Sequence, residues 1–490
     1  MTENHALIGV FTVPLLWATL AFLLGSGRGA WLAIFGSVGQ LFLALILARS
    51  VLVDGPLHHA TGGWGAPLGI DLYADGLTAA MLLLTQVVAL PIFVYARSYF
   101  TAGTAAARHF WPLAGFLIAG FLIAGMNALY LANDIFNLYV TLEIVGLAAV
   151  ALIAAGGAAG QIAAALRYLF AALLGSGVYL LGVALIYGTY GSVSIATLTP
   201  LIDATAPRAV SIAALLMFAG LMLKSALFPF HFWLPAAHGG APAPVSALLS
   251  ALVVKAAIYL CLRLWLGPLA PLVQVAAWLP GVLGAGAILW GSVMAIRTPR
   301  LKLLVAYSTV AQLGYLFLAF PLLTPGAAVL GAVTLQAFAH GLAKAAMFAA
   351  AGIIIHATGR DAVAEVAGVA ERLPLTLFAF ALAGVSLMGL PPSGGFLAKW
   401  LLLDAALSAG HWAMVAVIIA GGLLAAVYVF RVVRLAFLNL PEELAERQKK
   451  AGRPVPRILE WMAFGLAAAS VLLGIFSFDL LKLIAVGNPA

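Results

Sequence analysis

The sequence is dominated by apolar runs of about 20 residues that follow one another from end to end. Each run is long enough to cross roughly 30 Å of hydrocarbon at about 1.5 Å per helical residue. Of the 490 residues, 64% are hydrophobic and only 8% are charged. A soluble fold of this length could not cover its surface with so few charges. The sequence therefore predicts an all-α integral membrane protein in contact with a lipid bilayer.

The apolar runs divide into about 14 expected transmembrane helices. Their cores are residues 6–24, 30–52, 72–96, 110–130, 133–155, 162–189, 209–234, 244–267, 274–296, 300–321, 326–357, 374–406, 410–438 and 458–484. No long soluble domain interrupts them, and the largest polar stretch is 441–457.

Basic residues are distributed unevenly between the two sides of this arrangement. Sixteen of the 24 lysines and arginines lie in loops or helix ends after odd-numbered spans, and four lysines lie inside spans. The loops and helix ends of the opposite side hold the other four, which are Arg49, Arg208, Arg263 and Lys482. Cytoplasmic loops are enriched in basic residues, which predicts that both termini lie on the outer face of a bacterial or archaeal cytoplasmic membrane. The net charge of +8 therefore reflects topology, and we expect no nucleic-acid partner.

Two expected spans contain helix breakers. The seventh is interrupted around Pro229, and the twelfth is interrupted by Pro391, Pro392, Gly394 and Gly395. Such breaks are tolerated in a membrane where they face protein or a wet cavity, although they could also reflect helix packing alone. Because the breaks lie five spans apart, we expect two inverted five-helix repeats, spans 4–8 and 9–13. The expected segments are 1–105 (three helices), 106–268 (first repeat), 269–440 (second repeat) and 441–490 (a cytoplasmic loop and the last helix).

A row of ionisable residues passes through the hydrophobic interior. Its members are Glu143, Lys224, Lys255, His340, Lys344 and Lys399. A charge within the bilayer costs several kcal/mol unless it is paired, hydrated or neutralised. The alternatives are a structural ion pair that joins helices and, for His340, a neutral histidine with satisfied hydrogen bonds. We favour a relay in which water chains between these groups carry protons, since lysine can take up and release a proton when partly buried.

Other polar residues carry weaker signals. His231, Asp134, His238 and Asp404 could serve as auxiliary groups, although Asp134 and Asp404 fit interfacial positions equally well, as do Asp71 and Asp75. For His238 and His356 we favour a solvated or loop histidine. The single cysteine, Cys261, lies in a span and excludes a disulfide framework or a cysteine cluster site. We expect no cofactor and no metal site, because Glu143 is the one carboxylate placed near the mid-plane.

Four motifs make the chain similar to a known family. They are NDIFNLYVTLE at 133–143, KSALFPFHFWLPAAH at 224–238 followed by APAPVSALLS and Lys255, HGLAKAAMF at 340–348, and GLPPSGGFLAK at 389–399. They resemble the proton-translocating antiporter-like subunits shared by Mrp-type cation/proton antiporters, respiratory complex I (NADH:quinone oxidoreductase) and membrane-bound hydrogenases. The likeness is clearest over residues 70–435, and the first motif is most similar to the D subunit of Mrp antiporters.

The resemblance implies an order for the interior row. Glu143 and Lys224 would pair at one half-channel, Lys255 and His340 with Lys344 would form a central relay, and Lys399 would be the exit site of the other half-channel. One departure is Ala236, where family members often have an aspartate after Trp-Leu-Pro.

The resemblance also implies partners and a choice of functions. The first is a subunit of a multi-subunit Mrp-like antiporter that exchanges Na⁺, or another monovalent cation, for H⁺. The second is a proton-pumping subunit of a complex I-like dehydrogenase or membrane hydrogenase, and the third is the membrane partner of an inorganic-carbon uptake complex. In each case we expect other membrane subunits as partners and redox chemistry, if any, outside this chain. A purely structural membrane scaffold is the non-transport alternative.

Overall fold

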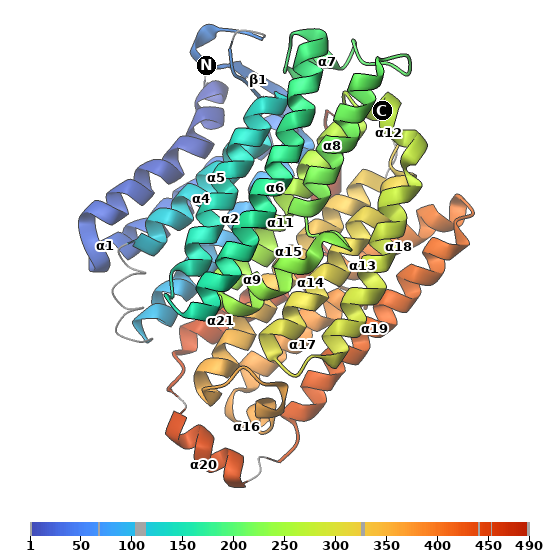
Figure 1. Cartoon of the computed structure of the whole chain (residues 1–490). Coiled ribbons are helices and arrows are strands. Elements are labelled where there is room, and N and C mark those ends of the chain that lie inside the picture. The colour runs from blue at the N-terminus through green and yellow to red at the C-terminus, as the bar shows by residue number, and fades with distance from the viewer. Residues whose placement is uncertain are drawn as a thin grey trace.

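The chain folds into a bundle of long, side-by-side helices (Figure 1). The computed structural model describes residues 2–66, 69–102, 114–324, 329–439, 442–451 and 453–487. Within these ranges ten helices are long and apolar enough to cross a membrane, and two further apolar helices are shorter. The all-α membrane fold is confirmed, whereas the expected number of 14 spans is not reproduced as 14 continuous helices.

The N-terminal part contains two spans and a small hairpin. Helix α1 (Thr2–Asp54) turns back at Gly25, whose φ of +75° suits a residue without a Cβ, and so forms the spans His5–Gly25 and Gly27–Asp54. Strands β1 (Leu57–Ala60) and β2 (Asp71–Ala74) then pair antiparallel, a short element that the apolar pattern did not predict.

The next helices follow the expected spans closely. They are α2 (Gly76–Thr101), α4 (Phe116–Leu131), α5 (Ile135–Ala154), α6 (Ala159–Tyr190), the short α7 (Ile195–Leu198), the broken span α8 (Arg208–Lys224) with α9 (Leu234–Gly240), and α10 (Ala243–Leu248) continued by α11 (Val254–Leu266). A π-helical turn at Leu249–Val253 joins α10 to α11 within one span.

The second half shows the same order of a long helix packed against a broken span. Its elements are α12 (Ala270–Val273), α13 (Trp278–Arg297), α14 (Leu301–Leu318), α15 (Val329–Thr358), α16 (Val369–Arg372), the broken span α17 (Pro374–Met388) with α18 (Gly394–Ser408), α19 (Trp412–Ala436), α20 (Glu442–Ala451), α21 (Arg457–Leu472) and α22 (Phe478–Ile484). Helix α15 packs along α17 and α18 as α6 packs along α8.

The last expected span differs from the structure. Residues 458–484 form two helices, α21 and α22, separated by a turn that contains Gly474. A Cβ at Gly474 would lie 2.0 Å from the carbonyl oxygen of Pro392. The turn therefore packs directly on the break between α17 and α18, a contact that no local pattern reveals.

The connecting segments gather at two opposite ends of the bundle. At one end Gly76 N donates to Val486 O and Ile195 N to Asn133 O, so β2, α7 and the C-terminal segment lie together with the N-terminus (Figure 1). At the other end Val363 N donates to Pro299 O, and α16 and α20 lie there. We call the end that holds β2, α7 and the C-terminal segment the terminal end, and the end that holds α16 and α20 the α20 end. That the terminal end faces outward stays a prediction.

Burial identifies the centre of the bundle. The span Ala243–Leu266 is buried along its whole apolar window, and α15 is 94% buried, whereas only a third of the window in α19 is buried. The interior row of ionisable residues lies largely on these central helices and their neighbours, so the fold shields it from lipid.

Candidate functional site

The first ion pair lies where the seventh span breaks. Lys224 is the last residue of α8, and its Nζ donates to Glu143 Oε1 on α5 at 2.8 Å. The two side chains are 6% and 17% exposed, so each charge depends on the other for stabilisation. Gly175 on α6 makes room for the lysine, because a Cβ there would lie 3.0 Å from Lys224 Cγ. The structure thus contains the pair that the resemblance implied, with a neighbouring glycine that sequence reasoning missed.

Side chains around the break replace lost backbone hydrogen bonds. The indole of Trp233 donates to Leu223 O at 2.9 Å and stacks on Tyr168 with centroids 4.4 Å apart. His231 accepts from Trp290 Nε1 on α13 at 3.1 Å. The break is therefore held by protein contacts, as the membrane requires, and His231 contacts α13.

Lys255 lies at the centre of the bundle next to an irregular turn. It is 1% exposed, and its Nζ donates to the carbonyl oxygen of Ser250 in the π-helical turn. A π turn displaces one residue from the regular helical ladder, and such turns are frequent at functional sites. The hydroxyl of Ser250 is 2.8 Å from that of Thr309 on α14. Lys255 is thereby connected to α14 through one residue.

His340 and Lys344 lie one turn apart on α15 and are both fully buried. Lys344 Nζ donates to Val305 O at 3.1 Å and to the hydroxyl of Ser308, and Thr309 Oγ1 donates to the same Val305 oxygen at 3.0 Å. Among the described residues the ring nitrogens of His340 have no hydrogen-bond partner, so the donor and the acceptor of its imidazole are both unused by protein groups there.

Lys399 occupies the second break. Its Nζ donates to Leu387 O near the end of α17 and lies 4.4 Å from the ring centroid of Tyr315. Gln312 Nε2 donates to the same Leu387 oxygen at 3.1 Å, and Gln336 Nε2 donates to Gln312 Oε1 at 3.1 Å. A cation above an aromatic face is stabilised without a counter-ion. Among the described residues, Lys399 is therefore held by an oxygen and a ring and not by a carboxylate.

Helix α14 is the structural link that the sequence analysis missed. Its polar residues join the lysines in two hydrogen-bonded groups: Lys255, Ser250, Thr309, Val305 O and Lys344 in one, and Lys399, Leu387 O, Gln312 and Gln336 in the other. Ser308, Thr309, Gln312 and Tyr315 recur at helical spacing within an apolar span. That spacing puts them on one face, and it is the signal that could have identified them.

The auxiliary residues lie in different places. His238 is 1% exposed in α9 with Nδ1 3.0 Å from Leu234 O, so the expectation of a solvated or loop histidine is wrong. His238 is buried because α9 packs against α14 and α6. Asp134 caps α5 by accepting from Asn137 N at 2.6 Å, and burial raises the pKa of Asp134 above its usual value. Asp404 is exposed on α18.

Two charged residues outside the row form a second buried ion pair. Arg263 on α11 bonds both carboxylate oxygens of Asp75, which caps α2 and also accepts from Thr78 N at 2.9 Å. Burial acts to raise the pKa of Asp75, but the guanidinium and the Thr78 N–H outweigh it and hold this pKa below its usual value. From the sequence, Arg263 was expected among the basic residues of loops and helix ends, and Asp75 at an interface or in a functional role. Their pairing was not predicted, because the two residues lie 188 positions apart.

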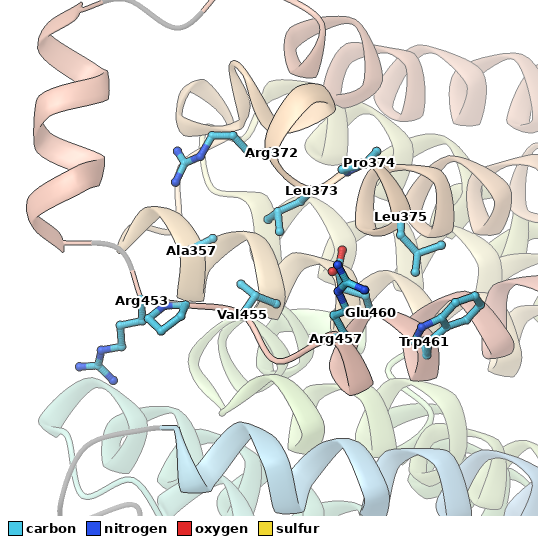
Figure 2. A pocket seen from close by; sticks show the side chains of 11 residues that line it. Ala357, Arg372, Leu373, Pro374, Leu375, Arg453, Val455, Arg457, Glu460 and Trp461 are labelled. Carbon is cyan, nitrogen blue, oxygen red and sulfur yellow. The ribbon is translucent and has the colours of Figure 1, made fainter.

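A separate cavity of about 560 Å³ lies at the α20 end, between α15, α17 and α21 (Figure 2). Arg372, Arg453, Arg457, Glu460 and Trp461 are among its lining residues, and none of the interior row is.

Across the described ranges no group of three or more His, Cys, Asp or Glu side chains is placed to hold a metal ion. The interior row itself consists of four amines, an imidazole and one carboxylate, and the described partners of its lysines also include neutral oxygens.

Comparison with known proteins gives consistent matches. The family model described as NADH:quinone oxidoreductase/Mrp antiporter, transmembrane, matches residues 132–425. The N subunit of the NADH-quinone oxidoreductase of Desulforudis audaxviator is 40% identical over 422 residues, 84% of this chain and 81% of that protein. The D subunit of the Na⁺/H⁺ antiporter of Alkalihalophilus pseudofirmus is 28% identical over 459 residues, 91% of this chain and 89% of that protein. A chain in the structure of the Mrp complex from a Dietzia species matches with a TM-score of 0.88 and 27% identity, covering 99% of this chain and 96% of that one.

Proposed function

The chain belongs to the NADH:quinone oxidoreductase/Mrp antiporter family, and on that premise we propose that its interior row of ionisable side chains translocates protons. It is a multi-pass, antiporter-like membrane subunit, and its structural relatives are subunits of multi-subunit membrane complexes. The observation that carries the proposal is the burial of the four lysines of the row together with His340 in one bundle, when a single ion pair would suffice to join helices.

The contacts of the four lysines support different roles along the row. Lys224 bonds a carboxylate, whereas the described partners of Lys255, Lys344 and Lys399 are neutral oxygens and a ring. A proton on Lys224 is held by the charge of Glu143 and is released when that contact breaks. A proton passed to the later lysines is not held by a counter-ion, so it can move on through the hydrogen-bonded groups along α14.

The complex that this chain serves is the second part of the proposal. An Mrp-like antiporter that exchanges Na⁺ or another monovalent cation for H⁺ is supported by the full-length likeness to Mrp chains in both sequence and structure. A complex I-like proton-pumping role is the second candidate, supported by the 40% identity to an N subunit. Mass spectrometry of chains that co-purify with the tagged protein in mild detergent separates them. Small membrane subunits with Na⁺-dependent proton flux support the first candidate, and iron–sulfur subunits support the second.

Proton flux in vesicles that contain the intact complex tests the relay itself. We expect Glu143→Ala or Lys224→Ala to abolish flux while the complex still assembles. Lys399→Arg should also block flux, because arginine does not release its proton at accessible pH. Asp361→Asn is the matched control, since Asp361 lies outside the interior row and pairs with Arg300, whose side chain is 51% exposed. Unchanged flux in both alanine variants would leave the structural scaffold as the better account.

A further inference from the structure

A cavity of about 330 Å³ lies at the terminal end of the bundle. Its lining includes the exposed side chains of His58 and Thr199 and the buried side chain of Asp75, with Arg263 beside it. We call this space the outer cavity. It reaches from exposed residues down to a buried ion pair, so one end of it is accessible to water and the other is not.

A second, small space lies deeper, against the central lysine. It has a volume of about 10 Å³, and Lys255, Met81 and Thr334 are among its lining residues. This is close to the smallest volume that holds one water molecule. Leu77, Tyr259 and Leu262 line both this space and the outer cavity. These three side chains form the wall between the outer cavity and Lys255.

The spacing of residues along α11 connects the two spaces. Lys255, Tyr259 and Arg263 follow one another at intervals of four and therefore lie on one face of the helix. Eight residues of helix span about 12 Å. The three side chains therefore form a stripe that extends from the central lysine to the floor of the outer cavity. It is a polar path through an otherwise apolar wall.

Hydrogen bonds close this path at its outer end. Arg263 bonds both oxygens of Asp75, and it also donates to Thr78 Oγ1 at 2.6 Å and to the hydroxyl of Tyr259 at 2.8 Å. Tyr259 in turn donates to Tyr130 O at 2.6 Å. A guanidinium remains charged at accessible pH and repels an approaching cation, so it is a barrier until it moves aside.

We propose that the stripe from Lys255 to Arg263 is a gated access route for protons between the central lysine and the terminal end of the bundle, with the Asp75–Arg263 ion pair as its gate. When the pair separates, water joins the two cavities. The ammonium of Lys255 then gives a proton to water and becomes a neutral amine, and the resulting hydronium leaves past Tyr259. The identity of the transported ion rests on the proposed function, but the existence of a gated water path does not.

Thiol protection tests the path without measuring transport. In a Cys261→Ser background, Thr334→Cys places a thiol in the deep space, and Thr199→Cys places one in the outer cavity as the control. Vesicles with the terminal end facing the medium are exposed to Ag⁺, a cation of about the size of water. The protein is then denatured, and the thiols that Ag⁺ has not blocked are labelled with a fluorescent maleimide.

Asp75→Asn is the gate variant, because asparagine keeps the helix cap but loses the charge that holds Arg263. We expect Ag⁺ to block Thr334→Cys at least tenfold faster in Asp75→Asn than with Asp75 intact, and Thr199→Cys equally fast in both. If Asp75→Asn does not fold, Asp75→Asn with Arg263→Gln removes both charges and should give the same increase.

The labelling results test the gated route independently of the proton relay. An unchanged rate at Thr334→Cys in the folded gate variants, or faster blocking only when Ag⁺ is added at the α20 end, overturns the route. Faster blocking from the terminal end upholds the route even if Lys224→Ala leaves proton flux unchanged, a result that would refute the relay alone.

Discussion

Breaking the contact between Glu143 and Lys224 should reveal a strong, specific coupling between the two residues. At an N–O distance of 2.8 Å, Coulomb attraction is about 6 kcal/mol with an effective dielectric constant of about 20. Desolvation of two charges offsets much of this, and couplings between contacting residues seldom exceed about 3 kcal/mol. Because Glu143 retains 17% exposure, we expect a coupling free energy of about 2 kcal/mol.

A double-mutant cycle measures this quantity. Glu143→Gln, Lys224→Met and the double variant are unfolded by SDS titration of the purified chain in micelles, and the free energy of unfolding is compared with that of the parent. Glu143→Gln should lose about 3 kcal/mol, since it leaves a buried ammonium without its counter-ion. The double variant should lose less than the sum of the single variants, by the coupling free energy.

An ion pair with an exposed arginine provides the control for the cycle. Arg300 is 51% exposed, whereas Lys224 is 6% exposed, and the two carboxylates, Asp361 and Glu143, are similarly exposed at 19% and 17%. A pair with one partner in solvent should couple by no more than about 1 kcal/mol. A coupling below about 0.5 kcal/mol between Glu143 and Lys224, no larger than that of the control pair, would refute the argument that burial makes the first pair interdependent.

Three further predictions follow from contacts in the same bundle. Gly175→Ala should destabilise the chain by about 1–3 kcal/mol, because its Cβ would lie 2.9 Å from a carbonyl oxygen of α8. Gly177→Ala is the control and should be neutral, since a Cβ there would have nothing within 4 Å. SDS titration compares the free energies of unfolding of the two variants. Gln312→Leu should slow proton flux at least tenfold per assembled complex, since it removes the hydrogen bonds to α17 and to Gln336, and normal flux would exclude this residue from the relay. Because the pKa of Asp75 is held below its usual value, its stabilisation is present above its unfolded pKa and is lost as pH falls through the lower folded pKa. The stability gap between parent and Asp75→Asn should therefore stay constant from pH 7 to about 5 and shrink only below about pH 4, and a gap that shrinks at neutral pH would contradict the sign.

Much of the site was predictable because a charge in hydrocarbon is costly in any fold. Glu143, Lys224 and Lys399 are recognisable from the apolar runs that contain them, and Pro229 and Pro391 indicate the breaks beside two of them. Their roles in proton transfer stay a proposal. Neutral polar residues cost much less than charges once they are hydrogen-bonded, so nothing in the composition of α14 required a connection between lysines.

The residues that sequence reasoning placed wrongly or missed depend on distant contacts. Arg263 was counted among the loop charges, although it bonds Asp75 from 188 positions away. His238 was taken for a loop histidine, although α9 carries it into the core. The turn at Gly474 divides the last apolar run because it packs on the second helix break.

The sequence by itself determined the membrane class, the approximate positions of most helices and the row of ionisable residues. These follow from local quantities, namely the length of helix that crosses a bilayer and the cost of a charge within it. Only the tertiary structure decided which oxygen each lysine bonds, how α14 connects Lys255 to Lys344, and that Asp75 and Arg263 pair in the lining of the outer cavity. Those contacts join segments far apart in the chain, and their free energy depends on distance and burial that exist only after the helices have packed.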